Sequence, residues 1–184
     1  MDEWGPLAGL AGAWEGNDGV DVAFHNAKGA VGETHYLEKV QLNPFGPVEN
    51  GAQSLYGLDY RMAAWRHGEE SMNPFHTEVG YWLWDATDDQ VMRCFMVPRG
   101  TVLIAGATCA ASSSSFTLTA DPGEGCYGIL ENRYLAGAAS TRHYECTIEV
   151  GDDTWQYASD TVVQLKATGN ELHHTDRNVL HRVS

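Results

Sequence analysis

The chain has 184 residues, a length that suits one domain, and 43% of its residues are hydrophobic, which is enough to fill one core. Its formal net charge of −14 creates a negative field that repels polyanions, so we expect neither nucleic acid nor an anionic membrane surface as a partner. These values favour a single soluble domain over residues 1–184.

Several common catalytic and metal-binding motifs are absent from the sequence. It contains no Gly-x-Ser-x-Gly elbow, no phosphate-binding glycine loop with a lysine, and no His-Glu-x-x-His. The four cysteines form no Cys-x-x-Cys pair, so their spacing does not support a zinc or thioredoxin-like site. No basic segment followed by an apolar run opens the sequence, and no apolar stretch approaches the roughly 18 residues of a membrane span. We therefore expect a cytoplasmic protein with reduced thiols.

The predicted secondary structure is dominated by short strands. Residues 5–12 are rich in glycine and alanine and predict a short helical turn. Residues 16–19 (Gly-Asn-Asp-Gly) are typical of a turn, and residues 20–25 alternate between apolar and polar side chains as a strand does. Further strands, separated by Gly, Pro, Asn and Asp, are expected at residues 34–42, 54–65, 76–85, 90–97, 101–108, 116–119, 128–135, 141–150, 154–166 and 172–183.

About ten strands at hairpin spacing, with no helical segment long enough for a crossover, suit a barrel or a sandwich. Closure into a barrel removes unpaired strand edges, and ten strands leave an interior wide enough for a ligand. We therefore predict an all-β fold: a single antiparallel closed β-barrel of about ten strands with a short N-terminal helical turn.

Two adjacent histidines near the C-terminus, His173 and His174, lie in the last expected strand. Neighbouring residues of a strand point to opposite faces, so one ring faces the interior and the other faces solvent. A neutral buried imidazole is a suitable axial ligand for haem iron, and its second ring nitrogen usually needs an acceptor. Asp176 lies on the same strand face as His174. A pair of structural or solvent-exposed histidines fits the same pattern.

A second candidate site lies at residues 75–81 (Phe-His-Thr-Glu-Val-Gly-Tyr). With a period of two, His76, Glu78 and Gly80 share one strand face. A histidine beside a carboxylate on the inner wall would form a hydrogen-bonded pair, and the glycine would leave room for a ligand to approach. An outward polar face, with the alternate residues in the core, fits this spacing equally well.

Three stretches of the sequence share motifs and order with one known family. Residues 10–16 (Leu-Ala-Gly-Ala-Trp-Glu-Gly) are similar to its opening Leu-x-Gly-x-Trp-x-Gly, and residues 75–81 to its central His-x-Glu-x-Gly. Residues 172–182 fall where the family places its proximal histidine. By these motifs, nearly the whole chain resembles the nitrobindin family of haem-binding β-barrels, which are related in shape to fatty-acid-binding proteins.

This resemblance implies a ten-stranded barrel with b-type haem at one mouth. The family's iron is ligated by the C-terminal histidine and keeps an open or weakly occupied distal side, which implies nitric oxide binding or conversion of peroxynitrite to nitrate at ferric iron. By position, His174 is the implied iron ligand and His76 the implied pocket or distal residue. His173 is the other candidate for contact with haem.

The alternative is a non-catalytic carrier, in which the same barrel binds a fatty acid or another small apolar molecule without haem. A carboxylate ligand needs a polar anchor, and an arginine that points inward could provide it. A barrel without any ligand is a third interpretation. The candidate anchors are Arg61, Arg66, Arg133 and Arg142.

Overall fold

The computed structural model of the protein describes residues 2–25, 27–123 and 125–183. Met1 and Ser184, the ends of the expected domain, lie outside these residues. A 3-10 segment, η1 (Asp2–Leu10), comes first, and a short helix, α1 (Arg133–Ala138), interrupts the strands. The strands are β1 (Gly12–His25), β2 (Ala30–Asn50), β3 (Gln53–Arg66), β4 (His76–Asp85), β5 (Gln90–Val97), β6 (Thr101–Thr108), β7 (Ser115–Ala120), β8 (Ile129–Glu131), β9 (Ala139–Val150), β10 (Thr154–Leu165) and β11 (Glu171–Arg182).

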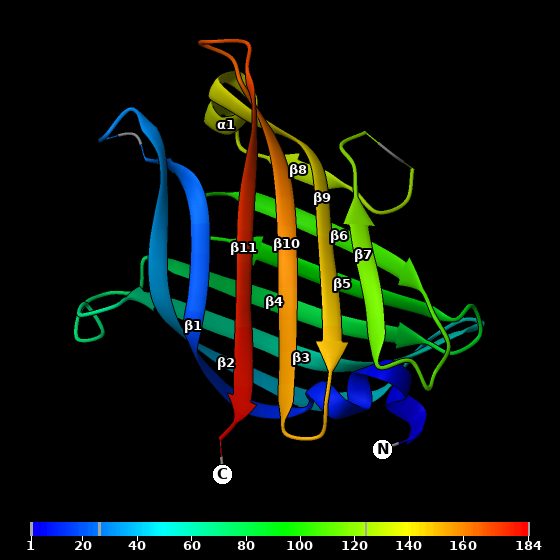
Figure 1. Ribbon diagram of the computed structural model, residues 1–184. Coiled ribbons are helices and arrows are strands. Elements are labelled where there is room, and N and C mark those ends of the chain that lie inside the picture. The colour runs from blue at the N-terminus through cyan, green and yellow to red at the C-terminus, as the bar shows by residue number, and fades with distance from the viewer. Residues whose placement is uncertain (1, 26, 124, 184) are drawn as a thin grey trace.

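Ten strands form one closed antiparallel barrel (Figure 1). Their order is β5-β4-β3-β2-β1-β11-β10-β9-β7-β6, and pairing of β6 with β5 closes the ring. β8 is an additional short strand that pairs with the start of β6. The prediction of an all-β barrel of about ten strands is confirmed, and η1 is the predicted N-terminal helical turn.

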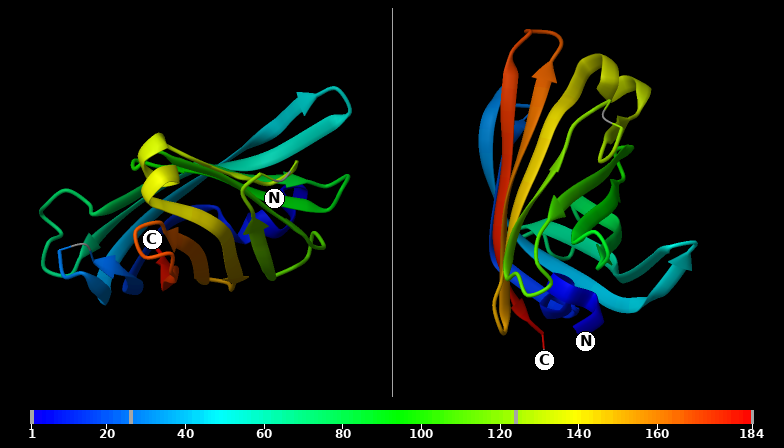
Figure 2. Two further views of the ribbon diagram at one scale, coloured as in Figure 1. Left: turned by 90° about the horizontal axis from the view of Figure 1, so that it is seen from above. Right: turned by 90° about the vertical axis from the view of Figure 1, so that its right-hand side faces the viewer.

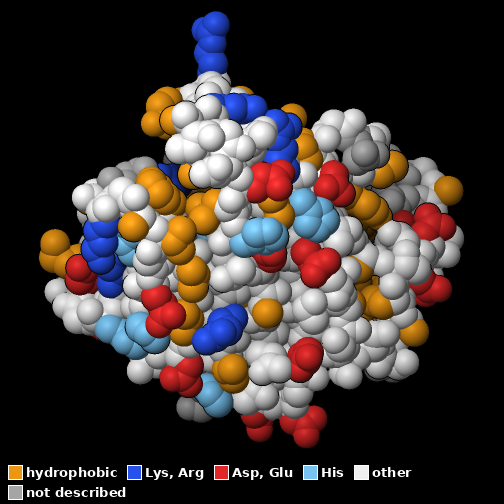
Figure 3. All heavy atoms as spheres, turned by 45° about the horizontal axis from the view of Figure 1, so that its top comes forward, with side chains coloured by type: hydrophobic (Ala, Val, Ile, Leu, Met, Phe, Trp, Pro, Cys, Tyr) orange, Lys and Arg blue, Asp and Glu red, His pale blue; other side chains and the backbone are white. Residues whose placement is uncertain are grey.

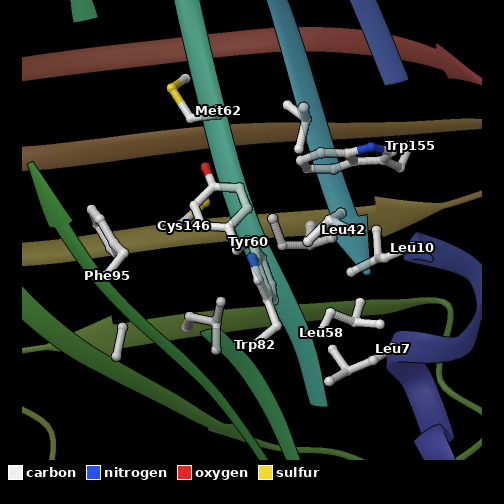
Figure 4. Packing of buried hydrophobic residues seen from close by; sticks show 14 of the residues in the cluster. Leu7, Leu10, Leu42, Leu58, Tyr60, Met62, Trp82, Phe95, Cys146 and Trp155 are labelled. Carbon is white, nitrogen blue, oxygen red and sulfur yellow. The ribbon is translucent and has the colours of Figure 1, made fainter. Parts of the chain in front are cut away.

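One end of the barrel is filled by tightly packed apolar side chains. Leu7 and Leu10 of η1 are completely buried, and Figure 4 shows them beside Leu42 and Leu58 of the barrel wall. The indole Nε1 of Trp4 donates to the carbonyl of Gly57 at 3.0 Å and fastens η1 to β3. The largest side chains with at most 1% exposure in the core are Trp14, Trp82, Trp84, Tyr36 and Tyr60.

The opposite end of the barrel carries part-exposed side chains on its inner face. Figure 2 shows β9, β10 and β11 standing apart from β4, β5 and β6 at this end, whereas η1 lies between the walls at the other. Two histidines on the inner face here, His76 and His174, keep 33% and 40% of their side-chain surface exposed. We call this region, remote from η1, the open end.

One predicted turn, and part of one expected connection between strands, are instead irregularities within long strands. Residues 16–19 lie inside β1, where the register against β2 shifts between Gly16 and Gly19, as in a β-bulge. A Cβ atom on Gly19 would lie 2.3 Å from the ring of Tyr36, so glycine is required there by close packing and not by a turn. Likewise, β2 continues through residues 43–47 to Asn50, with a register shift between Phe45 and Val48.

The strand predicted at 128–135 was also partly wrong. The observed strand, β8, ends at Glu131, and α1 begins at Arg133. The side-chain Oδ1 of Asn132 accepts hydrogen bonds from the backbone N–H groups of Tyr134 and Leu135, at 2.8 and 3.0 Å. This capping satisfies donors that a helix start leaves free, which outweighs the weak strand pattern. Neither helix in the described ranges is long and apolar enough to cross a membrane.

Candidate functional site

The two adjacent histidines of β11 point to opposite sides of the barrel wall. His174 shares the inner face with Asp176, Asn178 and Leu180, of which the last two are at most 3% exposed. His173 faces solvent with 64% of its side chain exposed, and its Nδ1 lies 2.6 Å from Asp160. Of the pair, His174 is therefore the ring available to a ligand inside the barrel.

A carboxylate on the neighbouring strand holds the His174 ring. Nε2 of His174 lies 2.6 Å from Oδ1 of Asp21, whose own side chain is 15% exposed. Asp21 reaches this position because β1 pairs with β11, where it lies directly opposite Asp176. Because Nε2 contacts Asp21, Nδ1 is the ring nitrogen left for a ligand. A metal-bound histidine usually has a hydrogen-bond partner of this kind on its other ring nitrogen.

His76 is on the inner face of β4 and also contacts a carboxylate. Its Nε2 lies 3.2 Å from Oε1 of Glu78, two residues further along the strand. Burial disfavours the charged ring, but the hydrogen bond and charge of Glu78 outweigh it and raise the pKa of His76. The side-by-side His–Glu pair expected from the sequence is therefore present, and it faces inward.

Glu78 is in turn bound by a buried arginine on the next strand. The guanidinium of Arg93 donates to Oε2 of Glu78 at 2.6 Å, and to the hydroxyls of Tyr60 at 3.0 Å and Tyr144 at 2.7 Å. It also lies 4.4 Å from the centre of the Phe95 ring. Burial opposes ionisation of Glu78, but the positive charge of Arg93 prevails and lowers the pKa of this carboxyl to about 2. Glu78 is thus a fixed anion that orients His76.

A second buried polar cluster, the Glu38 cluster, consists of Glu38, Tyr36, Tyr157, Asp176 and Asn178. Tyr157 and Asn178 each donate to Oε2 of Glu38 at 2.9 Å, and the Tyr36 and Tyr157 hydroxyls lie 2.7 Å apart. Tyr36 also donates to Oδ1 of Asp176. Among the described residues, no cation contacts Glu38 as Arg93 contacts Glu78, so burial raises the pKa of Glu38 to about 7. Burial also raises the pKa of Asp176 to about 6.

Asp176 connects the two histidines electrostatically. The positive charges of His174 and His76 both act on the pKa of Asp176 and lower it, and the charge of Asp176 in turn contributes to the raised pKa of His76. The charges of the two histidines and Asp176 are therefore coupled, although three strands separate β4 from β11 along the sheet. The inner wall of the open end combines two imidazoles with a negatively charged floor.

Gly80 has a different role from the one expected from the sequence. A Cβ atom on Gly80 would lie 2.0 Å from the carbonyl oxygen of Cys94 and 2.7 Å from the Cα atom of Phe95. The space that glycine leaves is occupied by the backbone of β5 and is not free for a ligand. This residue is needed for close pairing of β4 with β5.

The four arginines expected as carboxylate anchors do not converge on the floor of the barrel. Arg61 lies opposite the outward-facing Val79, Arg133 is exposed on α1, and Arg142 is exposed and bonded to Gln164. Arg66 lies at the open end, 4.8 Å above the ring of Phe75.

The arginine that does reach the interior, Arg93, was not singled out from the sequence, and neither was Glu38. Both interrupt the apolar face of their strands: Arg93 lies between Val91 and Phe95, and Glu38 between Tyr36 and Val40. A charged residue on an otherwise apolar strand face could have identified them. Asp21 carried no such signal, because its proximity to His174 depends on pairing between the first and last strands.

The side chains of the open end fit a haem group. A porphyrin supplies four nitrogen ligands and needs one or two from the protein, and His174 offers one inward-facing imidazole already hydrogen-bonded to a carboxylate. Part-exposed apolar residues, including Val163 and Leu172, flank it on β10 and β11. Within residues 2–25, 27–123 and 125–183, no group of three or more His, Cys, Asp or Glu side chains is arranged to hold a bare metal ion.

Comparisons with known proteins agree with this geometry. The family model described as "THAP4-like, heme-binding beta-barrel domain" matches residues 3–182. Among solved structures, the crystal structure of Rv2717c from M. tuberculosis is similar, with a TM-score of 0.67 and 18% identity over 97% of this chain and 95% of that chain. At this identity the likeness shows the fold alone. Comparison with curated proteins found no match. Because the family match spans nearly the entire sequence, this chain belongs to the THAP4-like, haem-binding β-barrel family, as the resemblance of its motifs predicted.

Proposed function

We propose that the protein binds b-type haem at the open end of the barrel, with His174 as the axial ligand to iron. One observation carries this proposal. Of the two adjacent histidines, His174 faces the interior and has a carboxylate partner, whereas His173 points into solvent. Membership of a haem-binding family supports haem as the bound group.

The residues around His174 would position the ring. Asp21 accepts from one imidazole nitrogen, fixes the ring orientation and makes the other nitrogen a stronger donor to a metal. The strand pairing of β1 with β11 holds Asp21 in place, so the ligand is set by the barrel wall and not by a loop. Val163 and Leu172, on the inner faces of β10 and β11, would provide apolar contact for the porphyrin.

His76 would define the second side of the pocket. Glu78 holds its ring, and Arg93 and Tyr60 hold Glu78. The ring can therefore donate or accept a hydrogen bond at a fixed place within the barrel. Bound haem supplies an iron that takes diatomic ligands such as nitric oxide and, in the ferric state, can convert peroxynitrite to nitrate. We assign His76 to contact with such a small ligand.

A hemin titration of the purified protein tests the proposal. We expect a sharp Soret band at one equivalent of hemin, and loss or broadening of this band in His174→Ala. His173→Ala is the matched control, because it removes the adjacent ring from the outer face, and its spectrum should equal that of the unmodified protein. Equal spectra for the His174 variant and the unmodified protein would place the ligand elsewhere.

The titration also distinguishes haem binding from the alternative, a haem-free carrier of an apolar ligand. If hemin does not bind, and native mass spectrometry finds a co-purified lipid in the barrel, the haem proposal is overturned. In that case Arg66, which lies at the open end above Phe75, is the arginine available to the lipid carboxylate.

A further inference from the structure

The outer wall formed by β4, β5 and β6 carries an unusual apolar surface. Side chains alternate along each strand, so the residues between the buried positions face outward. These outward positions include Val79, Tyr81, Met96, Val102 and Ile104, with exposures from 39% to 51%. A solvated wall of an antiparallel sheet normally alternates between apolar inside and polar outside, and this wall does not.

The exposed apolar residues are contiguous because strand pairing places them side by side. Val79 pairs with Met96, Met96 with Val102, and Val102 with Leu130 of β8, which is 74% exposed. Tyr81 pairs with Cys94, and Cys94 with Ile104, in the adjacent row. We call this surface the apolar wall, defined by Val79, Tyr81, Cys94, Met96, Val102, Ile104 and Leu130.

Charge is nearly absent from the outward positions of these three strands. In β4, β5 and β6, all of whose residues the structure describes, Asp85 is the one charged residue at an outward position. It is 3% exposed, and its carboxylate accepts from Gln53 and from the backbone of Thr87. The wall of β9, β10 and β11, in front in Figure 1, contrasts strongly: Arg142, Glu145, Glu149, Glu171 and Arg177 are all exposed there. Acidic and histidine side chains crowd together on the face shown in Figure 3.

We infer that the apolar wall is the contact surface between two copies of this chain. Each copy has a net charge of −14, so the repulsion between two copies is smallest when they meet through a face that carries almost no charge, and this wall is such a face. In a two-fold dimer the same patch meets itself, which an uncharged apolar surface satisfies without needing opposite charges.

The size of the surface fits this role. The exposed fractions of the large side chains correspond to on the order of 500 Å² of apolar area, near the top of the range for the largest patch on a monomer. A standard interface covers about 800 Å² on each partner, and the part-exposed Leu83 and Met92 extend the same wall toward that value. Arg61 and Asp59 border the wall on β3 and supply both signs of charge at its rim.

Sedimentation of the unmodified protein at two salt concentrations tests the inference first. Because repulsion between the two negative copies opposes association, we expect a dimer whose dissociation constant falls at least about threefold between 0.05 and 0.5 M NaCl. A monomer at all protein concentrations up to several hundred micromolar would overturn the inference, and so would a dimer that weakens as salt is added.

Two matched variants then locate the interface. Val102→Glu places a charge in the apolar wall and should raise the dimer dissociation constant at least about tenfold. Val162→Glu places the same charge at an outward position of β10 on the opposite wall and should leave it unchanged. An equal rise in the dimer dissociation constant for both variants would refute the assignment of the apolar wall as the interface. A monomer that instead floats with phosphatidylcholine vesicles would show that lipid covers the wall.

The outcome is independent of the haem proposal, because the apolar wall lies on the outside of the barrel. Both variants should keep the far-ultraviolet circular dichroism spectrum of the unmodified protein, which shows that they fold whether or not hemin binds.

Discussion

Two buried carboxylates in the barrel, Glu38 and Glu78, differ in their partners and therefore in their charge. Arg93 lies 2.6 Å from Glu78 and keeps it ionised, whereas Glu38 is hydrogen-bonded by neutral groups, Tyr157 and Asn178. Removing one partner of a buried ion pair leaves the other charge unpaired, so Arg93 and Glu78 depend on each other for stability. By contrast, burial of Glu38 favours its protonated, neutral form in the folded protein.

Glu38→Gln should therefore change how stability depends on pH. Burial raises the pKa of Glu38 from 4.5 to about 7 in the folded protein, so the folded state holds this proton over a range in which the unfolded chain has lost it. Its contribution is full below pH 4.5 and is lost as the pH rises through about 7, a change of roughly 3 kcal/mol. Glutamine keeps the amide oxygen as acceptor for Asn178 and Tyr157 and cannot ionise.

Urea unfolding at pH 5 and pH 8 measures this effect. The fall in the free energy of unfolding between the two values should be smaller in Glu38→Gln than in the unmodified protein. Glu145→Gln, at an exposed position on β9, is the control and should leave the fall unchanged. Identical pH dependence in all three proteins would show that Glu38 is already ionised in the folded state.

At the scale of secondary structure, the strands with clear alternation were the ones that the sequence predicted well. Residues 76–85, 90–97 and 101–108 match β4, β5 and β6 in full. The errors fall where a local signal competes with long-range pairing: residues 16–19 favour a turn on their own, but pairing of β1 with β2 and β11 keeps them in a strand. Which face of β11 turns inward could not be predicted, since one register slip reverses every side chain.

The pairing of β4 with β5 depends on Gly80, and Gly80→Ala tests this. The added methyl group would approach two backbone positions of β5, which cannot move away as a side-chain end can. We expect a loss of about 1–3 kcal/mol in the free energy of unfolding. Urea unfolding of the variant at neutral pH measures the loss.

Gly137→Ala is a suitable comparison for this substitution. Gly137 lies in α1 with no atom within 4 Å of the added Cβ, so alanine should be neutral or stabilise the protein by up to about 1 kcal/mol. If the two variants were equally stable, the close approach of β5 at Gly80 would not be a constraint on the fold.

At the scale of the whole molecule, the two ends of the barrel have different tasks. The η1 end buries large apolar side chains such as Leu7, Leu10 and Trp14, while the open end carries the histidines and part-exposed apolar residues that would receive a ligand. A binding end cannot be packed as tightly as a core and still admit a ligand. We therefore expect stability to be concentrated at the η1 end.

Two leucine-to-alanine substitutions compare the two ends directly. Leu7 is completely buried in η1, so Leu7→Ala should leave a cavity and cost about 2–5 kcal/mol. Leu172 has the same side chain on the inner face of β11, beside Val163, but it is only partly buried, so Leu172→Ala should cost about 1 kcal/mol or less without ligand. Urea unfolding gives both values.

The effects of the two variants on hemin affinity should be in the opposite order to their effects on the free energy of unfolding. Leu7 is far from the proposed pocket, so its variant should keep the hemin affinity of the unmodified protein once folded. Leu172→Ala removes apolar contact beside His174 and should weaken hemin binding while sparing the fold. Equal loss of stability at both ends would mean that the barrel is packed alike throughout its length, and a binding pocket at the open end would then lack the loose packing it requires.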